Sequence, residues 1–255
     1  MKTIFLLLAF FTCAAAQNPT LQKERQILLD FRIDRKISDA RIPAATQRNV
    51  LSKMFRRYLT DSARCNAEFD TSKGTDPLAE ARKGGQIVPS IIDMTSGSFT
   101  ASGQTQTLYV ISVSECNASH ADNFGTKRVA IFSGHQMVAD VDADFASDIV
   151  RKTDLNSDGI DELLMTTGDM AQGTVTEMAT LVSFQGGRRR VIQDFGAVVE
   201  DSCAAEMEGS TSDASVIYIS DVGLGSMPKI TQENYSASCR GKQRQWKLVS
   251  RGKKQ

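Results

Sequence analysis

The stretch Asp154-Leu155-Asn156-Ser157-Asp158-Gly159-Ile160-Asp161-Glu162-Leu163-Leu164 joins a glycine-containing acidic turn to an apolar run. Gly159 allows the sharp bend that such a turn requires, because glycine adopts backbone angles that other residues avoid. The segments on either side, 148–150 and 162–165, contain aliphatic residues in short runs. We therefore expect two strands joined by an acidic loop.

The chain from residue 87 onward repeats this arrangement of short apolar runs separated by Gly, Ser, Asn and Asp. The strand candidates lie at 107–113, 128–132, 148–150, 162–165, 178–184, 191–195, 215–219 and 246–249. Ser133-Gly134 and Gly186-Gly187 fall between candidates, where tight hairpin turns are needed. This spacing predicts an antiparallel β module over residues 87–250, followed by a basic tail at 251–255.

The acidic stretch has a counterpart earlier in the chain. Ser98–Gly103 aligns with Asp154–Gly159, and the same alignment sets 108–110 over 164–166. A third, more degraded unit runs over 215–249. Repeats of this size predict blade-like units of a few strands each, without a closed propeller.

The N-terminal part, residues 17–62, has a different pattern. Its apolar residues recur at helical spacing, and Ile42-Pro43 interrupts them because proline disfavours helix at the residue before it. We expect a hairpin of two helices near 20–41 and 44–60, followed by a linker at 63–86. The predicted fold class is α+β: an N-terminal helical hairpin and a predominantly antiparallel β module with propeller-blade-like repeats.

Residues 1–16 have the order of a cleaved secretory signal peptide. Lys2 precedes the apolar run 4–11, and three alanines at 14–16 precede Gln17. The apolar run is too short to span a bilayer. We expect a mature chain that begins at about Gln17 and is secreted or periplasmic, with no transmembrane segment.

Four cysteines remain after the signal segment: Cys65, Cys116, Cys203 and Cys239. Their even number in an exported chain favours disulfides, and their wide spacing matches no CxxC metal pattern. The sequence alone allows three pairings. We favour the sequential one, Cys65 with Cys116 and Cys203 with Cys239.

The acidic loop has the spacing of a calcium site. Asp154, Asn156 and Asp158 stand at loop positions one, three and five, and the backbone carbonyl of Ile160 follows at position seven. Calcium takes six to eight oxygen ligands, and this spacing brings three short side chains and a carbonyl toward one point. The alternative is an Asp-Gly turn whose carboxylates cap backbone amides without metal.

The loop and its flanking strands resemble the calcium loop of FG-GAP and VCBS-type repeats, which occur in integrin α-subunits and many bacterial secreted proteins. The resemblance implies Asp154, Asn156, Asp158 and Glu162 as side-chain ligands. That family usually has Asp at the ninth loop position, where this chain has Glu162. The loop is not an EF-hand, because position twelve is Met165 and the flanks are predicted strands.

Enzyme signatures are absent: the sequence has no GxSxG, HExxH, Walker A or Rossmann motif. A formal net charge of zero argues against a nucleic-acid binder. We expect a secreted, non-enzymatic protein with a structural calcium loop and a β surface that binds an unidentified protein or glycan. The alternative is a secreted hydrolase that uses carboxylates within 140–161 and is supported by calcium.

Overall fold

The computed structural model describes residues 25–33, 42–55, 58, 87–115, 126–144, 146–203, 209–239 and 244–251. Their elements, in chain order, are β1 (Gln26–Asp30), α1 (Ala44–Met54), β2 (Ile87–Gly97), β3 (Gln106–Glu115), β4 (Thr126–Ser133), β5 (Gln136–Asp144), β6 (Asp148–Thr153), β7 (Glu162–Ala171), β8 (Thr174–Ser183), η3 (Gln185–Gly187), β9 (Arg190–Asp201), β10 (Thr211–Ser220), β11 (Lys229–Ser238) and β12 (Lys247–Arg251). The signal segment, the linker at 63–86, Cys65 and Cys116 lie outside the described residues.

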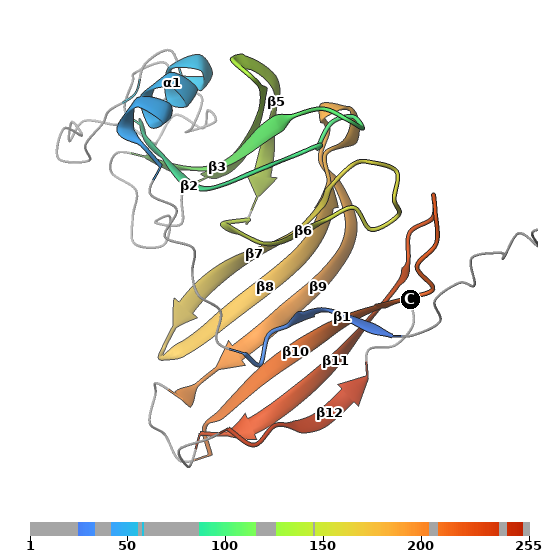
Figure 1. Cartoon of the computed structure of the whole chain (residues 1–255). Helices are drawn as coiled ribbons and strands as arrows, with labels where there is room; N and C mark the ends of the chain where they lie inside the picture. Colours follow the sequence, from blue (N-terminus) through green and yellow to red (C-terminus); the bar gives the residue numbers. More distant parts are fainter. Residues whose placement is uncertain are drawn as a thin grey trace, which may run out of the picture.

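The strands form two antiparallel sheets (Figure 1). The smaller sheet has the order β2-β3-β4-β5, and α1 lies against it. The larger sheet follows the order β12-β11-β10-β9-β8-β7-β6, and β1 pairs with β10 beside this path. Neighbours in sequence are neighbours in each sheet, as expected for strands joined by short hairpins.

The predicted helical hairpin is wrong, and so is the α+β fold class. Of the described residues, 64% lie in strands and 9% are helical. This part of the chain is therefore mostly β, with a single α-helix. Residues 26–30, placed in the first predicted helix, form strand β1. Leu28 and Phe31 are buried there against the larger sheet. Their spacing suits a helix face, but an available sheet edge outweighs that local preference.

The sheet edge that β1 occupies belongs to β10. Only Ser212–Ala214 of β10 pair with β9, and the next residues, Val216–Ile219, pair with β1 instead. Arg25 precedes β1, and its guanidinium stacks on the Tyr218 ring at 3.5 Å. The N-terminal strand therefore completes a sheet whose other strands come from the C-terminal half.

The second predicted helix exists in a shorter form. Helix α1 begins directly after Pro43 and ends at Met54, within the predicted 44–60. Its Val50 and Leu51 are buried, together with Phe55 just beyond its end, in a core shared with the smaller sheet. Within the described residues, no helix is long and apolar enough to cross a membrane.

The two aligned loops of the predicted repeat lie against each other. An offset of 56 residues relates the ends of β2 and β6, Gly97 and Thr153, and also the starts of β3 and β7. Ser98 donates its backbone N–H to Asp161 Oδ2 at 2.8 Å, and Asp161 donates its own N–H to the Ser98 carbonyl at 2.7 Å. The contact holds the two sheets together at one end.

A shared apolar core fills the space between the two sheets. Its large, fully buried members come from the loop after β2, from β3, β4, β7 and β8, and from the residue that follows β8: Phe99, Leu108, Val110, Val129, Ile131, Leu163, Met165, Val182 and Phe184. Burial of so many large side chains makes the two sheets one packed unit.

Candidate functional site

The Asp154 loop (residues 154–161) is a closed turn held by its own acidic side chains. Both carboxylate oxygens of Asp154 accept backbone N–H groups, from Asp158 at 3.1 Å and from Gly159 at 2.9 Å. Asp158 Oδ1 accepts the N–H of Ile160 at 2.8 Å. These carboxylates satisfy donors that the tight turn would otherwise leave without a partner.

Glu162, the first residue of β7, is 3% exposed. Its carboxylate accepts the backbone N–H of Leu155 at 2.9 Å. Burial raises the pKa of this carboxyl, and the negative charges of Asp158 and Asp154 raise it further. Since the three carboxylates repel one another, a cation bound among them would relieve the repulsion.

The predicted calcium ligands agree in kind with what calcium takes, because every donor is an oxygen atom. Asn156 reaches across the loop: its Oδ1 accepts the N–H of Asp158 at 3.1 Å and its Nδ2 donates to Asp158 Oδ2 at 3.0 Å. Within the described residues, the loop carboxylates do not form a group of three with ligand atoms within 4.8 Å of one another. The hydrogen bonds match the capped Asp-Gly turn, yet each carboxylate oxygen keeps a second lone pair for a ligand.

The Asp154 loop is in contact with two other segments. Gly159, at φ 82°, packs so tightly on Ser102 that an added Cβ would lie 3.1 Å from the Ser102 Cβ. On another side, the carbonyl oxygen of Asn156 accepts the N–H of Gly225 at 2.6 Å. A cation in this loop would therefore fix the β2–β3 loop and the β10–β11 connection as well.

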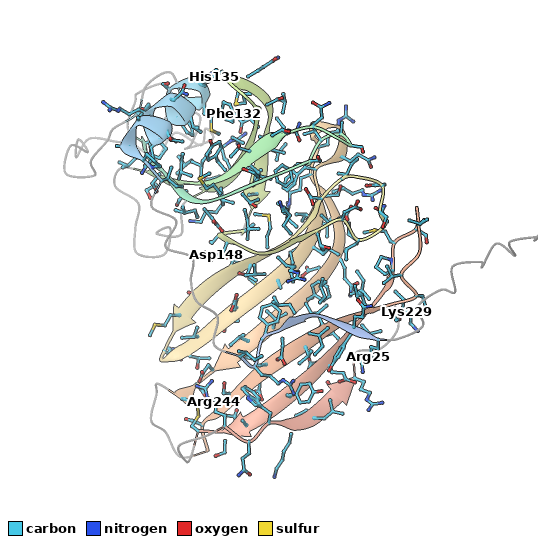
Figure 2. The ribbon with its side chains drawn as sticks, viewed as in Figure 1. Arg25, Phe132, His135, Asp148, Lys229 and Arg244 are labelled. Atoms are coloured by element: carbon cyan, nitrogen blue, oxygen red, sulfur yellow. A yellow bond between two sulfur atoms is a disulfide. The ribbon has the colours of Figure 1, made fainter. Side chains whose placement is uncertain are left out.

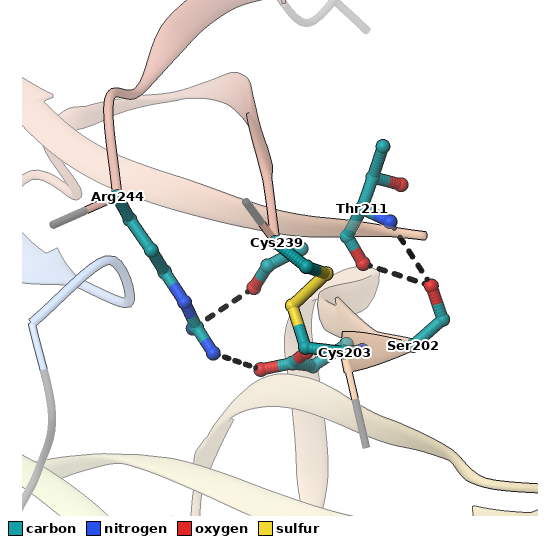
Figure 3. The surroundings of a disulfide bond; sticks show 7 residues. Ser202, Cys203, Thr211, Cys239 and Arg244 are labelled. Carbon is teal, nitrogen blue, oxygen red and sulfur yellow. Dashed lines mark hydrogen bonds and ion pairs between the residues drawn. A yellow bond between two sulfur atoms is a disulfide. The ribbon is translucent and has the colours of Figure 1, made fainter. Parts of the chain in front are cut away.

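Cys203 and Cys239 are joined by a disulfide, which is the one described member of the favoured pairing (Figure 3). Beside it, Asp201 Oδ2 accepts Arg244 Nη2 at 2.7 Å, and Arg244 Nη1 donates to Ser212 Oγ at 3.0 Å. Asp201 and the two sulfurs lie within 4.8 Å of one another. Because both sulfurs are oxidised, they are not thiolate ligands for a metal.

A groove of about 710 Å³ lies on the face of the larger sheet toward which β1 packs. Strands β1, β2 and β6 to β10, the segment after β1 and the segment before β12 line it: Leu29, Phe31, Arg32, Ile33, Asp93, Asp148, Ile149, Val150, Thr166, Gly168, Val175, Glu177, Val199, Asp201, Ser212, Ala214, Arg244 and Trp246. Asp148 and Arg244, both labelled in Figure 2, lie well apart along it. Its volume is in the range of small-molecule sites.

Ion pairs and backbone hydrogen bonds hold the charged groups of the groove. Arg32 Nη2 lies 2.6 Å from Asp30 Oδ2. Burial alone would raise the pKa of Asp30, but the hydrogen bonds and the positive charge of Arg32 lower it below its ordinary value. Asp93 Oδ2 accepts the N–H of Ile149 at 2.8 Å. Arg244 pairs with Asp201, as described above. Rigid polar groups around apolar walls are the usual arrangement of a ligand site.

The other carboxylates of the 140–161 stretch do not gather at one place. Asp140 and Asp142 of β5 both pair with Arg128 of β4, on the surface of the smaller sheet. Asp148 lines the groove, whereas Asp154 and Asp158 cap their own loop.

The groove was missed from the sequence for a physical reason. Phe31 and Trp246 are 215 positions apart in the chain, and they line one groove only because β1 and β12 join the same sheet. Alternation of side chains in β7 and β8 could have shown that Thr166, Gly168 and Glu177 share a face. This alternation does not indicate which other segments of the chain lie over that face.

Comparisons with protein-family models, curated proteins and solved structures found no match.

Proposed function

We propose that this chain is a secreted or periplasmic binding protein whose ligand site is the groove and whose Asp154 loop is a structural calcium site. The groove carries the proposal: a volume of about 710 Å³ with apolar walls from Phe31, Ile149, Val150 and Val199 and a few fixed charges. Such a lining is typical of sites that hold a ligand of small-molecule size. The volume and lining of the groove favour an amphipathic small ligand in place of the protein or glycan partner expected from the sequence.

A binding role is better supported than the hydrolase alternative. A carboxylate-dependent glycosidase places two carboxyl groups on either side of one scissile bond. In the 140–161 stretch, Asp148 alone lines the groove, and Asp140 and Asp142 are paired with Arg128 elsewhere. The groove wall offers ligand contacts without that pair of acids from the predicted stretch.

Calcium in the Asp154 loop is supported by the all-oxygen donor set and by the mutual repulsion of Asp154, Asp158 and Glu162. The resemblance to FG-GAP and VCBS-type loops supports the same assignment. The role would be structural, because the loop contacts Ser98 and Gly225 on neighbouring segments. Affinity on the order of 10⁻⁴ to 10⁻³ M is expected of an extracellular module.

The calcium proposal is tested by thermal unfolding of the chain from Gln17 in EDTA and in millimolar calcium. A ligand of the native state must raise the midpoint by linkage. We expect a rise with calcium in the wild type and none in Asp158→Ala. Asp169→Ala is the matched control, since Asp169 is exposed and, among the described residues, accepts a hydrogen bond from the N–H of Met170 alone. A midpoint insensitive to calcium in the wild type would remove this assignment.

The groove proposal is tested through Trp246, which lines the groove and is the one tryptophan of the chain. Its fluorescence reports ligand entry directly. Three probes share a ten-carbon chain: decyltrimethylammonium and decanoate, each used below its micelle concentration, and decanol, used below its solubility limit. We expect at least one to cause a saturable change in Trp246 emission.

The groove-filling variant is Gly168→Phe. A Cβ at Gly168 would meet only the Thr176 carbonyl oxygen, at 3.8 Å, so a larger side chain has room to enter the groove. Thr176→Phe adds the same ring on the opposite face of the sheet, because side chains alternate along β8. Binding must be lost in Gly168→Phe and retained in Thr176→Phe. If no probe shows this pattern, the proposed function is wrong.

A further inference from the structure

We infer that the groove selects a small ligand with an apolar body and one positively charged group. This inference rests on the proposed function and specifies the ligand class of the same site.

The charge of the lining is the first reason. Four carboxylates line the groove, from Asp93, Asp148, Glu177 and Asp201, against two guanidinium groups, from Arg32 and Arg244. The described lining therefore has a formal charge of −2. Lys127 lies near Asp148 and interacts with its charge, and counting it still leaves the balance negative. The negative charge of the lining attracts a cationic ligand and repels an anionic one.

The positions of the two arginines are the second reason. Arg244 is held between Asp201 and Ser212, and Arg32 is held by both oxygens of Asp30. Each guanidinium charge is already balanced by the carboxylate that it contacts, so it attracts an anionic head group less than an unpaired cation would. Both arginines of the described lining therefore already have a carboxylate partner.

The aromatic side chains of the lining are the third reason. Phe31 and Trp246 come from the two segments that border the groove, after β1 and before β12. Aromatic faces attract ammonium groups, and tryptophan does so most strongly. Carboxylates and aromatic rings in one apolar groove match the chemistry of an ammonium group on a hydrocarbon or ring body.

Exposed apolar side chains near the groove suit the rest of such a ligand. Ile33 and Val175 line it and are 65% and 38% exposed. Met170 is opposite Val175 in the β7–β8 hairpin and is 66% exposed. A hydrocarbon body lying over these residues would remove them from water, which stabilises the complex.

The inference is tested with the three ten-carbon probes, whose dissociation constants follow from Trp246 emission. We expect decyltrimethylammonium to bind about tenfold tighter than decanol, and decanoate to bind more weakly than decanol. Glu177→Gln and Asp148→Asn should each lower the ratio of decyltrimethylammonium affinity to decanol affinity by about threefold, because each removes one negative charge from the groove. Glu200→Gln is the control, since Glu200 is exposed and one residue away from the groove-facing Val199 and Asp201.

The outcomes separate this inference from the proposed function. Suppose that decanoate or decanol binds as tightly as decyltrimethylammonium and that Gly168→Phe abolishes this binding. The charge preference would then be overturned, and the groove would remain a binding site. A cation preference unchanged in both Glu177→Gln and Asp148→Asn would also overturn the inference. If Gly168→Phe abolishes the binding of none of the three probes, both proposals fail.

Discussion

Gly159 and Gly103 occupy equivalent places in two aligned loops, and their surroundings differ. Both have positive φ, 82° and 71°, but a Cβ at Gly103 would meet nothing within 4 Å, whereas one at Gly159 would collide with Ser102. Gly103→Ala should therefore cost about 1 kcal/mol from backbone strain alone. Gly159→Ala should cost about 2–3 kcal/mol, because a steric contact adds to the same strain.

Urea unfolding of both variants in EDTA measures these two costs. Ser102→Gly should recover the difference between Gly159→Ala and Gly103→Ala, because it removes the side chain that the new methyl meets. Equal costs for the two alanine variants would contradict the packing described for Gly159.

Protonation of Glu233 at low pH should destabilise the part of the larger sheet that contains β1. It is 4% exposed, and Arg25 donates to Oε1 while Tyr235 donates to Oε2, each at 2.8 Å. Burial alone would raise the pKa of Glu233, but these partners lower it below its ordinary value of 4.5. A carboxyl with a lowered native pKa stabilises the fold above its unfolded pKa, and that stability is lost as the pH falls through the native value.

The corresponding variant is Glu233→Gln, with unfolding free energies measured at pH 7 and pH 3. At pH 7 the variant should lose about 1–3 kcal/mol, since Arg25 loses its ionic partner and one of the two acceptor oxygens becomes an amide NH2 group. Wild type and variant should converge toward pH 3. An equal difference at both values would show that Glu233 is not titrating between them.

At the residue scale, the Asp154 loop could be located from sequence because its determinants are local. Asp154, Asp158 and Gly159 act within six positions of one another, and all of their turn contacts lie inside the loop. The burial of Glu162 depends on the core shared by the two sheets, so it could not be predicted from the loop sequence.

Among the elements, the disulfide is the clearest source of stability in the C-terminal part. Cys203 follows β9 and Cys239 follows β11, with a separation of 36 residues. In the chain-entropy model, closing a loop of this size stabilises the native state by about 3–4 kcal/mol. The double variant Cys203→Ser/Cys239→Ser should unfold at correspondingly lower urea. Reduction of the wild type should have the same effect, and an unchanged midpoint in both would contradict it.

Several strands with branched or apolar runs could be predicted, but the apolar strands β1 and β2 were not, and neither was the polar strand β11. The candidates 107–113 and 128–132 lie inside β3 and β4, and the turn at Ser133-Gly134 is confirmed by the β4–β5 hairpin. Strand β11 was missed because Gln232, Glu233 and Asn234 carry no strand signal. It forms because β10 and β12 supply hydrogen-bonding partners on both sides.

At the scale of the whole molecule, the two sheets should be coupled through the contact between Ser98 and Asp161. Asp161→Ala removes the acceptor of the Ser98 N–H, and Asp169→Ala serves as the control at an exposed site. Native-state hydrogen exchange in EDTA should show amides of β2 and β3 opening at a free energy lower by about 1–2 kcal/mol. An equal loss of protection in β10 and β11 would mean that the sheets open as one unit.

The overall arrangement could not be derived from sequence, because it depends on pairings between distant segments. Local spacing placed residues 26–30 in a helix, and only the partial cover of β10 by β9 explains why they form a strand. The groove has the same origin, since its two bordering segments come from opposite ends of the chain.

Strand β1 also sets the order in which the molecule can be completed. Arg25 is made 208 residues before its partner Glu233, which at about 5–20 residues per second corresponds to about 10–40 s of synthesis. Leu28 and Phe31 share their core with residues as far away as Ala214 and Ile217, and contacts this distant in sequence form slowly. Strand β1 therefore cannot pair with β10 until residues 216–219 have been made, and a chain cut short before β10 would leave β1 without that partner.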